Sequence, residues 1–223
     1  MIKNFEGAIF DLDGTLINSG GYSNTMWSNI GEKYLNDSSF RPNREDDKAT
    51  RTMLLREIMK FIHEKYKAGE SFEELYDYVK DGIRNYYANE VTPKEGVIPF
   101  LDYCLEHNIK MCIASATEKD EIMIAVKSCG LEKYFPVILS CADVGKGKEC
   151  PNIFNEALKA LGTSPEKTWV FEDSLTAIKT AGKAGLNTVG IYDEFNFGHE
   201  EMKEVSTVYV DRGETMEKLI NEE

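Results

Sequence analysis

The pattern of apolar and polar residues predicts strands that alternate with helices along most of the chain. Short apolar runs that end in polar turns indicate buried strands at residues 8–10, 110–115, 137–139, 168–172, 188–191 and 207–210. Apolar residues spaced three or four positions apart predict helices at residues 96–106, 119–129, 151–161, 176–184 and 214–220. This alternation is typical of an α/β fold with a doubly wound, mainly parallel sheet.

The stretch at residues 18–92 interrupts this alternation and predicts helices only. Apolar residues at helical spacing indicate three of them, at about residues 22–35, 53–66 and 72–86. Ser71 and Glu74 form a capping-box pattern at the start of the last one. The polar stretch at residues 37–47 contains Pro42 and is predicted to be a loop.

These patterns predict a division of the chain into two domains. Residues 1–17 and 93–223 are expected to form the α/β core, and residues 18–92 an inserted, all-helical domain. The insertion is either structural padding or a lid. Because it begins directly after the first strand, it is well placed to cover a site at the end of that strand.

Composition limits the classes of partner and the cellular location expected for this chain. The chain has 223 residues, of which 42% are hydrophobic, enough for a sizeable core. Its net charge of −13 argues against nucleic acid and anionic membrane as partners, because both require a basic surface. No apolar stretch has the length of a membrane span, and the chain enters its first strand without a signal-peptide pattern. Five cysteines without CxxC pairing or metal-ligand spacing predict free thiols and a cytoplasmic location.

Polar residues suited to phosphoryl transfer follow four of the predicted strands: Asp11, Asp13, Ser115, Lys148, Glu172 and Asp173. Because the carboxyl ends of parallel strands meet at one edge of a sheet, these side chains are expected to lie together. Gly14, directly after the two aspartates, allows the chain to turn sharply there. A phosphate ester requires positive charge around its oxygens and an in-line nucleophile, and a carboxylate can be that nucleophile.

The same residues resemble the motifs of the haloacid dehalogenase-like hydrolases. Residues 11–15 match the first motif, D-x-D-G-T, and Ser115 stands where the second motif has Ser or Thr. Lys148 fits the third motif, and residues 171–174 match the fourth. Two residues depart from the common pattern of the third motif: Glu149 and Asn152.

This resemblance extends over residues 5–17 and about 93–210. The position and helicity of the insertion resemble the capped subgroup that contains phosphoglycolate phosphatases and β-phosphoglucomutases. The resemblance implies magnesium-dependent hydrolysis of a small phosphorylated metabolite through an aspartyl-phosphate. Asp11 would be the nucleophile, and Asp13 would be the general acid and then the general base.

The resemblance also implies which residues hold the phosphate and the metal. The phosphate would be bound by Ser115, Ala116 and Lys148. The ligands of Mg²⁺ would be Asp11, Asp173, the backbone carbonyl of Asp13 and, directly or through water, Glu172. Both Ser115 and Lys148 would also be catalytic, since Lys148 screens the repulsion between the nucleophile and the phosphate.

Two other functions stay open. A sugar phosphomutase of the β-phosphoglucomutase type typically carries a histidine early in its cap, in a stretch resembling A-E-Y-H. Here residues 20–23 read G-G-Y-S, and Asn18 also departs from the pattern, which makes a mutase less favoured. A phospho-receiver signalling domain also uses an aspartate, a hydroxyl and a lysine on a doubly wound sheet. Its phosphorylated aspartate lies on a later strand, however, and it has no large helical insertion.

The sequence leaves the substrate open, because the helical insertion carries no recognisable motif. Basic residues gather in one stretch of it: Arg41, Arg44, Lys48 and Arg51. They could meet a second anionic group on the substrate. The acidic residues Glu45, Asp46 and Asp47 lie among them, which favours a solvated and self-paired face instead.

Overall fold

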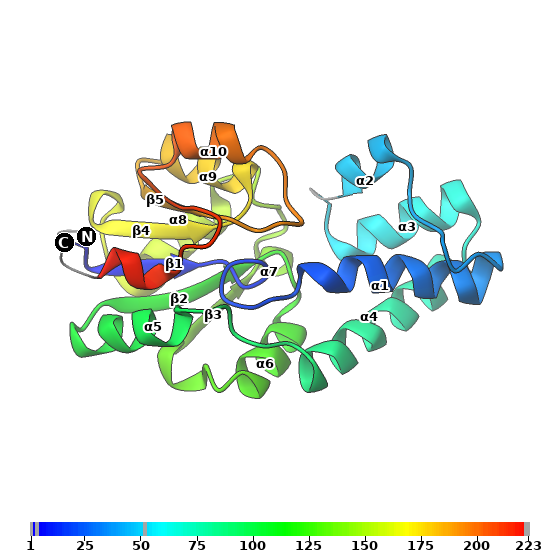
Figure 1. Ribbon diagram of the computed structural model, residues 1–223, viewed down its shortest axis with the longest axis horizontal. Coiled ribbons are helices and arrows are strands. Elements are labelled where there is room, and N and C mark those ends of the chain that lie inside the picture. The colour runs from blue at the N-terminus through cyan, green and yellow to red at the C-terminus, as the bar shows by residue number, and fades with distance from the viewer. Residues whose placement is uncertain (1, 3–4, 51–52, 221–223) are drawn as a thin grey trace.

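The structure is a computed structural model that describes residues 2, 5–50 and 53–220. The described residues form a sheet of six parallel strands in the order β3-β2-β1-β4-β5-β6 (Figure 1). The strands are β1 Gly7–Phe10, β2 Lys110–Ser115, β3 Val137–Ser140, β4 Thr168–Glu172, β5 Asn187–Ile191 and β6 Val208–Val210. The first strand of the chain is paired with β2 on one side and β4 on the other. Its carboxyl end therefore lies where the strand order reverses, the usual ligand position in such sheets.

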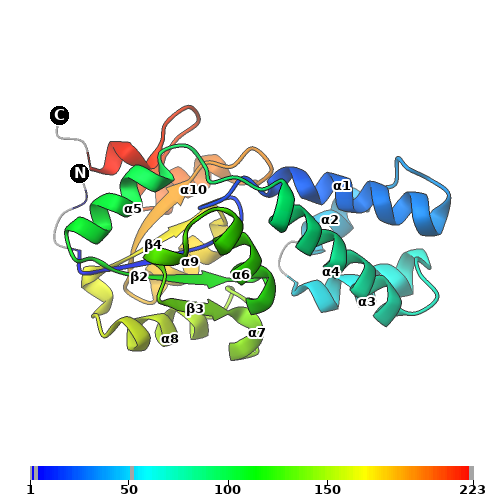
Figure 2. The same ribbon diagram turned by 90° about the horizontal axis from the view of Figure 1, so that it is seen from below.

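Helices cover both faces of this sheet (Figures 1 and 2). One face carries α5 Val97–Glu106 and α6 Lys119–Ser128, and the other carries α8 Asn152–Leu161 and α9 Leu175–Lys183, with α10 His199–Val205 packed on α9. Shorter turns connect them: α7 Cys141–Val144 and the 3₁₀ turns Glu132–Tyr134, Pro165–Lys167 and Met216–Leu219. None of the helices in the described part of the chain combines the length and apolarity that a bilayer crossing requires.

Aromatic packing fixes the end of β1. Successive residues point to opposite faces, so Phe10 packs with α5 and α6 while Ile9 packs with α8 and α9. The Phe10 ring stacks on Phe171 of β4 at 4.5 Å between centroids and meets Phe100 of α5 edge-on at 6.2 Å. Burial of each such ring contributes about 1.5–3 kcal/mol to stability. The strand is therefore rigid up to the residue before Asp11.

The insertion forms a helical unit beside the sheet. Its elements are α1 Gly20–Ile30, a π-helical turn Gly31–Leu35, α2 Arg44–Thr50, α3 Leu55–Tyr66 and α4 Phe72–Asn89. Its buried side chains, among them Trp27, Met59 and Leu75, form a hydrophobic cluster of their own. Figures 1 and 2 show this unit at one end of the molecule, beyond the carboxyl ends of the strands. The predicted fold class is confirmed, and the domain boundaries near residues 18 and 92 stay predictions.

Helix α4 joins the two parts of the molecule. Leu75, near its start, packs in the cluster of the helical unit, whereas Tyr87, near its end, packs in the cluster of the sheet. Ser71 caps the helix, and its hydroxyl accepts from the Glu74 backbone N–H at 3.1 Å, as the capping-box pattern predicted. Two ion pairs dock its middle on α6: Lys80 with Glu118 at 2.5 Å and Arg84 with Glu121 at 2.7 Å.

Two local predictions are wrong. The stretch at residues 37–47 is not a loop throughout, because α2 begins at Arg44, where the Asn43 side-chain oxygen accepts two backbone N–H groups at 3.0 Å. The last predicted helix, residues 214–220, is only a 3₁₀ turn, because its two apolar side chains are buried within a single turn.

Candidate active site

Asp11 lies directly beyond β1, at the centre of the sheet edge. Its backbone N–H donates to the carbonyl oxygen of Phe171 at 2.9 Å, which extends the pairing of β1 with β4 by one residue. The residue is only 7% exposed. A carboxylate held by a paired strand keeps a defined direction, as a nucleophile must.

Asp13 lies two residues further, where the chain turns back. The turn is made by Gly14 at φ +76°, and a Cβ there would come within 2.2 Å of an Asp173 carboxylate oxygen. Glycine is therefore required both by the backbone conformation and by the close approach. The two oxygens of Asp13 each accept a hydroxyl: Tyr87 donates to Oδ1 at 2.5 Å, and Thr117 donates to Oδ2 at 2.7 Å.

Lys148 reaches the same point from the loop after α7. Its ammonium donates to Asp11 Oδ1 and, at 2.6 Å, to Glu172 Oε1. The second oxygen of Glu172 accepts from the backbone N–H of Ser174 at 2.7 Å. The ammonium is thus held between two buried carboxylates, and the nucleophile candidate has its counter-charge in contact.

Asp173 completes the acidic cluster from the end of β4. The Asn196 side-chain amide donates to its Oδ2, and the Thr15 hydroxyl lies 3.5 Å from its Oδ1. One oxygen each from Asp11, Glu172 and Asp173 lies within 4.8 Å of the other two. The predicted ligand side chains therefore meet at one point.

Burial controls the ionisation of this cluster. Burial, opposed by Lys148 and assisted by the charges of Glu172 and Asp13, raises the pKa of Asp11 from 3.8 to about 8. Burial and the neighbouring Glu172 and Asp11 charges raise the pKa of Asp173 well above its usual value. Burial alone would lower the pKa of Lys148, but Asp11 and Glu172 hold it above its ordinary value. Asp11 and Asp173 therefore retain their protons to higher pH than exposed carboxyls, first because they are buried and second because other carboxylates lie beside them.

The donor set fits a hard divalent cation. Three buried carboxylates face a single ammonium, so the ionised cluster keeps a negative charge that water cannot screen. Carboxylate oxygens are the ligands that Mg²⁺ prefers. Within the described residues, the cluster contains no cysteine or histidine, the ligands that favour zinc and copper. The Asp13 carboxylate is not part of this group of three.

Ser115 is the last residue of β2, and Ala116 follows it at the same edge of the sheet. The Ser115 hydroxyl accepts from the Thr117 backbone N–H at 3.1 Å, and the residue is almost fully buried. A cavity of about 600 Å³ opens here. It is lined by every side chain that the sequence predicted for the site: Asp11, Asp13, Ser115, Ala116, Lys148, Glu172 and Asp173.

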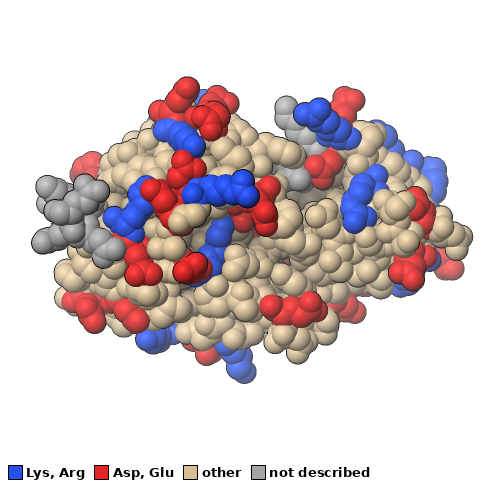
Figure 3. All heavy atoms as spheres, in the orientation of Figure 1, with Lys and Arg blue, Asp and Glu red and all other residues tan. Residues whose placement is uncertain are grey.

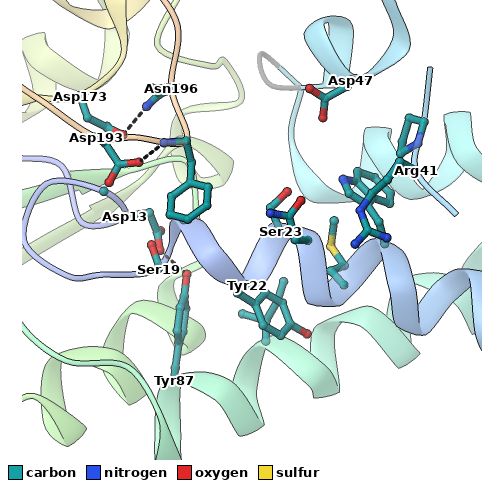
Figure 4. Close-up of a pocket in the computed structure, with 18 of the residues that line it drawn as sticks. Asp13, Ser19, Tyr22, Ser23, Arg41, Asp47, Tyr87, Asp173, Asp193 and Asn196 are labelled. Atoms are coloured by element: carbon teal, nitrogen blue, oxygen red, sulfur yellow. Dashed lines mark hydrogen bonds between the residues drawn. The ribbon is translucent and has the colours of Figure 1, made fainter. Parts of the chain in front are cut away.

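A second cavity of about 600 Å³ continues from Asp13 and Asp173 into the helical unit. Figure 4 shows its two sides, with the aspartates on the sheet facing Tyr22, Ser23 and Arg41 across the gap. The space-filling view shows the surface hollowed between the two parts of the molecule (Figure 3). The two cavities therefore lead from the acidic cluster toward α1 and the segment before α2.

The basic stretch of the insertion contributes two arginines to this cavity, Arg41 and Arg44. Asp46, which the sequence placed in a self-paired face, instead binds Lys65 of α3 at 2.6 Å. The Arg41 guanidinium donates to the carbonyl oxygen of Phe40 at 2.5 Å. Arg51 and the side chain of Lys48 lie outside what is described.

Four polar residues at the site were not predicted as site residues: Tyr87, Lys94, Thr117 and Asn196. Lys94 donates to the carbonyl oxygen of Gly14 at 2.7 Å and so holds the turn after Asp13. Thr117 and Asn196 follow β2 and β5, so the rule that ligands gather at strand ends could have found them. Tyr87 and Lys94 carry no such signal, because Tyr87 lies in α4 and Lys94 lies between α4 and α5, so neither follows a strand.

Comparison with known proteins agrees with this geometry. Residues 8–191 match the family of haloacid dehalogenase-like hydrolases. The chain is 27% identical over 195 residues to a phosphorylated carbohydrates phosphatase of Thermotoga maritima, covering 86% of this chain and 88% of that protein. It is 26% identical over 193 residues to a validoxylamine A 7'-phosphate phosphatase of Streptomyces hygroscopicus, covering 84% of this chain and 85% of that protein.

The fold is also that of solved structures. CbbY from Rhodobacter sphaeroides, in complex with phosphate, superposes with a TM-score of 0.79 at 20% identity, over 93% of this chain and 94% of that one. At this identity the likeness concerns the fold alone. Since the family match spans most of the sequence and includes Asp11, Lys148 and the carboxylates that end β4, the chain belongs to the haloacid dehalogenase-like hydrolases and is an enzyme.

Proposed function

We propose that this protein is a magnesium-dependent phosphatase that hydrolyses a small phosphorylated metabolite through an aspartyl-phosphate on Asp11. The observation that carries the proposal is the cluster at the sheet edge. There, Asp11 contacts the Lys148 ammonium. One oxygen each from Asp11, Glu172 and Asp173 lies within 4.8 Å of the other two, so that one cation could contact all three. The phosphatases among the relatives, one of them acting on phosphorylated carbohydrates, support phosphate esters as the substrate class.

The proposed reaction has two halves. First, an Asp11 carboxylate oxygen attacks phosphorus, the bond from phosphorus to the ester oxygen breaks, and Asp13 gives that oxygen a proton. Next, water attacks phosphorus and gives a proton to Asp13, and the bond to Asp11 breaks to release inorganic phosphate. Proton transfer of this kind contributes about 10²–10⁴-fold. Lys148, the Ser115 hydroxyl and backbone N–H groups near Ala116 hold the phosphate oxygens.

The metal ligands in this proposal are Asp11, Asp173, Glu172 and the backbone carbonyl of Asp13. A bound Mg²⁺ supplies positive charge to the phosphate oxygens and to the carboxylates around them. The protein's own contribution is to keep those carboxylates buried, together and oriented.

Activity assays on the purified protein test the proposal. The substrates are a chromogenic phosphate ester and a panel of phosphorylated metabolites, with Mg²⁺ and with excess chelator. We expect repeated, magnesium-dependent release of inorganic phosphate. A stoichiometric phosphoprotein without turnover would instead identify a phospho-receiver domain.

A phosphomutase stays the less favoured alternative. In the part of the chain that the structure describes, neither cavity is lined by any of the three histidines, His63, His107 and His199. Ser23 occupies the wall near the position where a mutase carries its histidine. Phosphorus NMR on a sugar 1-phosphate distinguishes the two activities, because a mutase gives a second sugar phosphate where a phosphatase gives inorganic phosphate.

We further propose that the helical unit, residues 18–92, is a cap that closes over Asp11 and selects the substrate. We expect Arg41→Ala and Arg44→Ala to change the ranking of metabolites by about tenfold, because each removes a charge from the cavity wall. Hydrolysis of a small generic ester should stay within about twofold, since the aspartates lie on the sheet. Lys60→Ala, an exposed basic residue of α3 outside the cavity, is the control. An equal loss on every substrate, the generic ester included, would contradict this assignment.

The raised pKa of Asp11 predicts a pH-dependent response to magnesium. The ordinary pKa of this carboxyl is 3.8, and its pKa in the folded, metal-free protein is about 8. Protonation of Asp11 therefore stabilises the metal-free fold fully below about pH 4, and this stabilisation is lost as the pH rises to about 8. Mg²⁺ binds the ionised carboxylate and must displace that proton. We therefore expect a larger magnesium-induced rise in melting temperature at about pH 9 than at about pH 6. Differential scanning fluorimetry would contradict this if the rise were equal or reversed.

A further inference from the structure

Two hydroxyl groups from distant parts of the chain hold the Asp13 carboxylate. The Tyr87 hydroxyl comes from the last turn of α4 in the helical insertion, and the Thr117 hydroxyl comes from the loop after β2. Figure 4 shows the Tyr87 side chain directed from α4 toward Asp13, at the edge of the cavity that enters the helical unit. A carboxylate accepts about four hydrogen bonds. One free lone pair on each oxygen thus remains for substrate or water.

Tyr87 is itself fixed in place. The residue is 5% exposed and packs in the cluster of the sheet. Its backbone carbonyl accepts the Ser128 hydroxyl of α6 at 2.5 Å. The ion pairs of Lys80 and Arg84 with α6 hold the preceding turns of α4 against the same helix. With the helical unit in the position seen in this structure, the hydroxyl reaches Asp13 from a helix that packs on the core domain rather than from a loop.

We propose that Tyr87 is a positioning residue for the reaction. Together with Thr117, it fixes Asp13 in the orientation from which the carboxyl proton passes to the leaving oxygen. The inference rests on the proposed function and adds a residue of the insertion to the acid–base machinery. Either hydroxyl alone leaves the carboxylate free to rotate about its bond to Cβ, whereas two donors on its two oxygens stop that rotation. The placement of α4 then governs proton transfer as well as the shape of the cavity.

This role makes a prediction that depends on the leaving group. An alkyl phosphate releases a strongly basic oxygen, which needs the Asp13 proton as its bond to phosphorus breaks. 4-Nitrophenyl phosphate releases a stable phenolate, which departs without that proton. The ratio kcat/KM covers the steps from free enzyme to the departure of the leaving group. Misorientation of Asp13 should therefore lower kcat/KM for the alkyl ester selectively.

The test compares Tyr87→Phe with the unaltered protein on propyl phosphate and 4-nitrophenyl phosphate, with Mg²⁺ present. We expect kcat/KM to fall about tenfold or more on propyl phosphate and to stay within about twofold on 4-nitrophenyl phosphate. Thr117→Val, which removes the other donor, should give the same selective loss. Tyr134→Phe is the matched control, since its hydroxyl binds Asp102 of α5 at 2.6 Å and neither residue lines the two cavities, so both esters should be unaffected.

The outcomes separate a positioning role from a structural one. Melting temperature and circular dichroism first establish that Tyr87→Phe is folded, which its retained ring favours. An equal fall on both esters, or no fall on either, would overturn the positioning role and leave the proposed function standing. Failure of the unaltered protein to hydrolyse either ester would overturn the proposed function and this inference with it.

Discussion

Replacing Asp11 with asparagine will abolish turnover while the protein stays folded. The amide has nearly the shape of the carboxylate but cannot form the bond to phosphorus, so we expect kcat to fall by at least about a thousandfold. The stability of the fold should not decrease. Lys148 keeps its bond to Glu172 at 2.6 Å, and the neutral amide carries no charge into the buried position whose desolvation raises the pKa of Asp11. The metal-free variant should therefore melt at the same temperature as the unaltered protein or higher.

Two further variants make this result secure. Asp11→Ala also lacks the nucleophile and cannot revert by deamidation. Asp102→Asn removes a carboxylate that binds Tyr134 and Lys133 away from the site, and its activity should be unchanged. Substantial magnesium-dependent activity in Asp11→Asn or Asp11→Ala would show that another group attacks phosphorus.

Replacing Asp173 with alanine will sharply raise the requirement for magnesium. Asp173 is one of three buried carboxylates whose oxygens lie within 4.8 Å of one another. Its loss leaves Asp11 and Glu172, both already bound to the Lys148 ammonium, as the side-chain donors of that group. We expect the magnesium concentration for half-maximal activity to rise by about 10–100-fold or more. Removal of a residue that orients a metal ligand typically lowers metal affinity by this factor. Magnesium titrations of activity measure this directly.

The control for this variant is Asp143→Ala, an exposed carboxylate on α7 whose removal should not change the titration. Calorimetric titration with Mg²⁺ gives a second readout that needs no turnover. An unchanged magnesium requirement in Asp173→Ala would remove this residue from the ligand set. Full activity in excess chelator, or a catalytic zinc found by elemental analysis, would contradict a magnesium enzyme altogether.

The sheet could be predicted from the sequence because its strands are short apolar runs bounded by polar turns. The pattern at residues 110–115 and 168–172 gave the bounds of β2 and β4, since strands buried on both faces tolerate few polar residues. Short helices were harder to predict. Helix α10 was missed because its seven residues carry few apolar side chains, of which Met202 is buried. Such a segment shows too few periods for its spacing to be recognised.

The site residues that lie at the ends of strands could be predicted from the sequence. Asp11, Ser115 and Asp173 follow three strands of one parallel sheet, and topology alone brings them together. The residues that orient them come from elsewhere. Tyr87 reaches Asp13 only because α4 docks on α6, and no local pattern in the sequence encodes that contact.

The most direct test of the central claim is to trap the covalent intermediate. The protein is mixed with a phosphate ester and Mg²⁺, quenched in acid during turnover, digested, and examined by mass spectrometry. We expect one added phosphoryl group on the peptide that contains Asp11. This group should be released as inorganic phosphate when quenching is delayed, and it should be absent from Asp11→Asn. A protein that turns over without any phosphorylated peptide, or that carries the phosphoryl group on another residue, would contradict hydrolysis through an Asp11 aspartyl-phosphate.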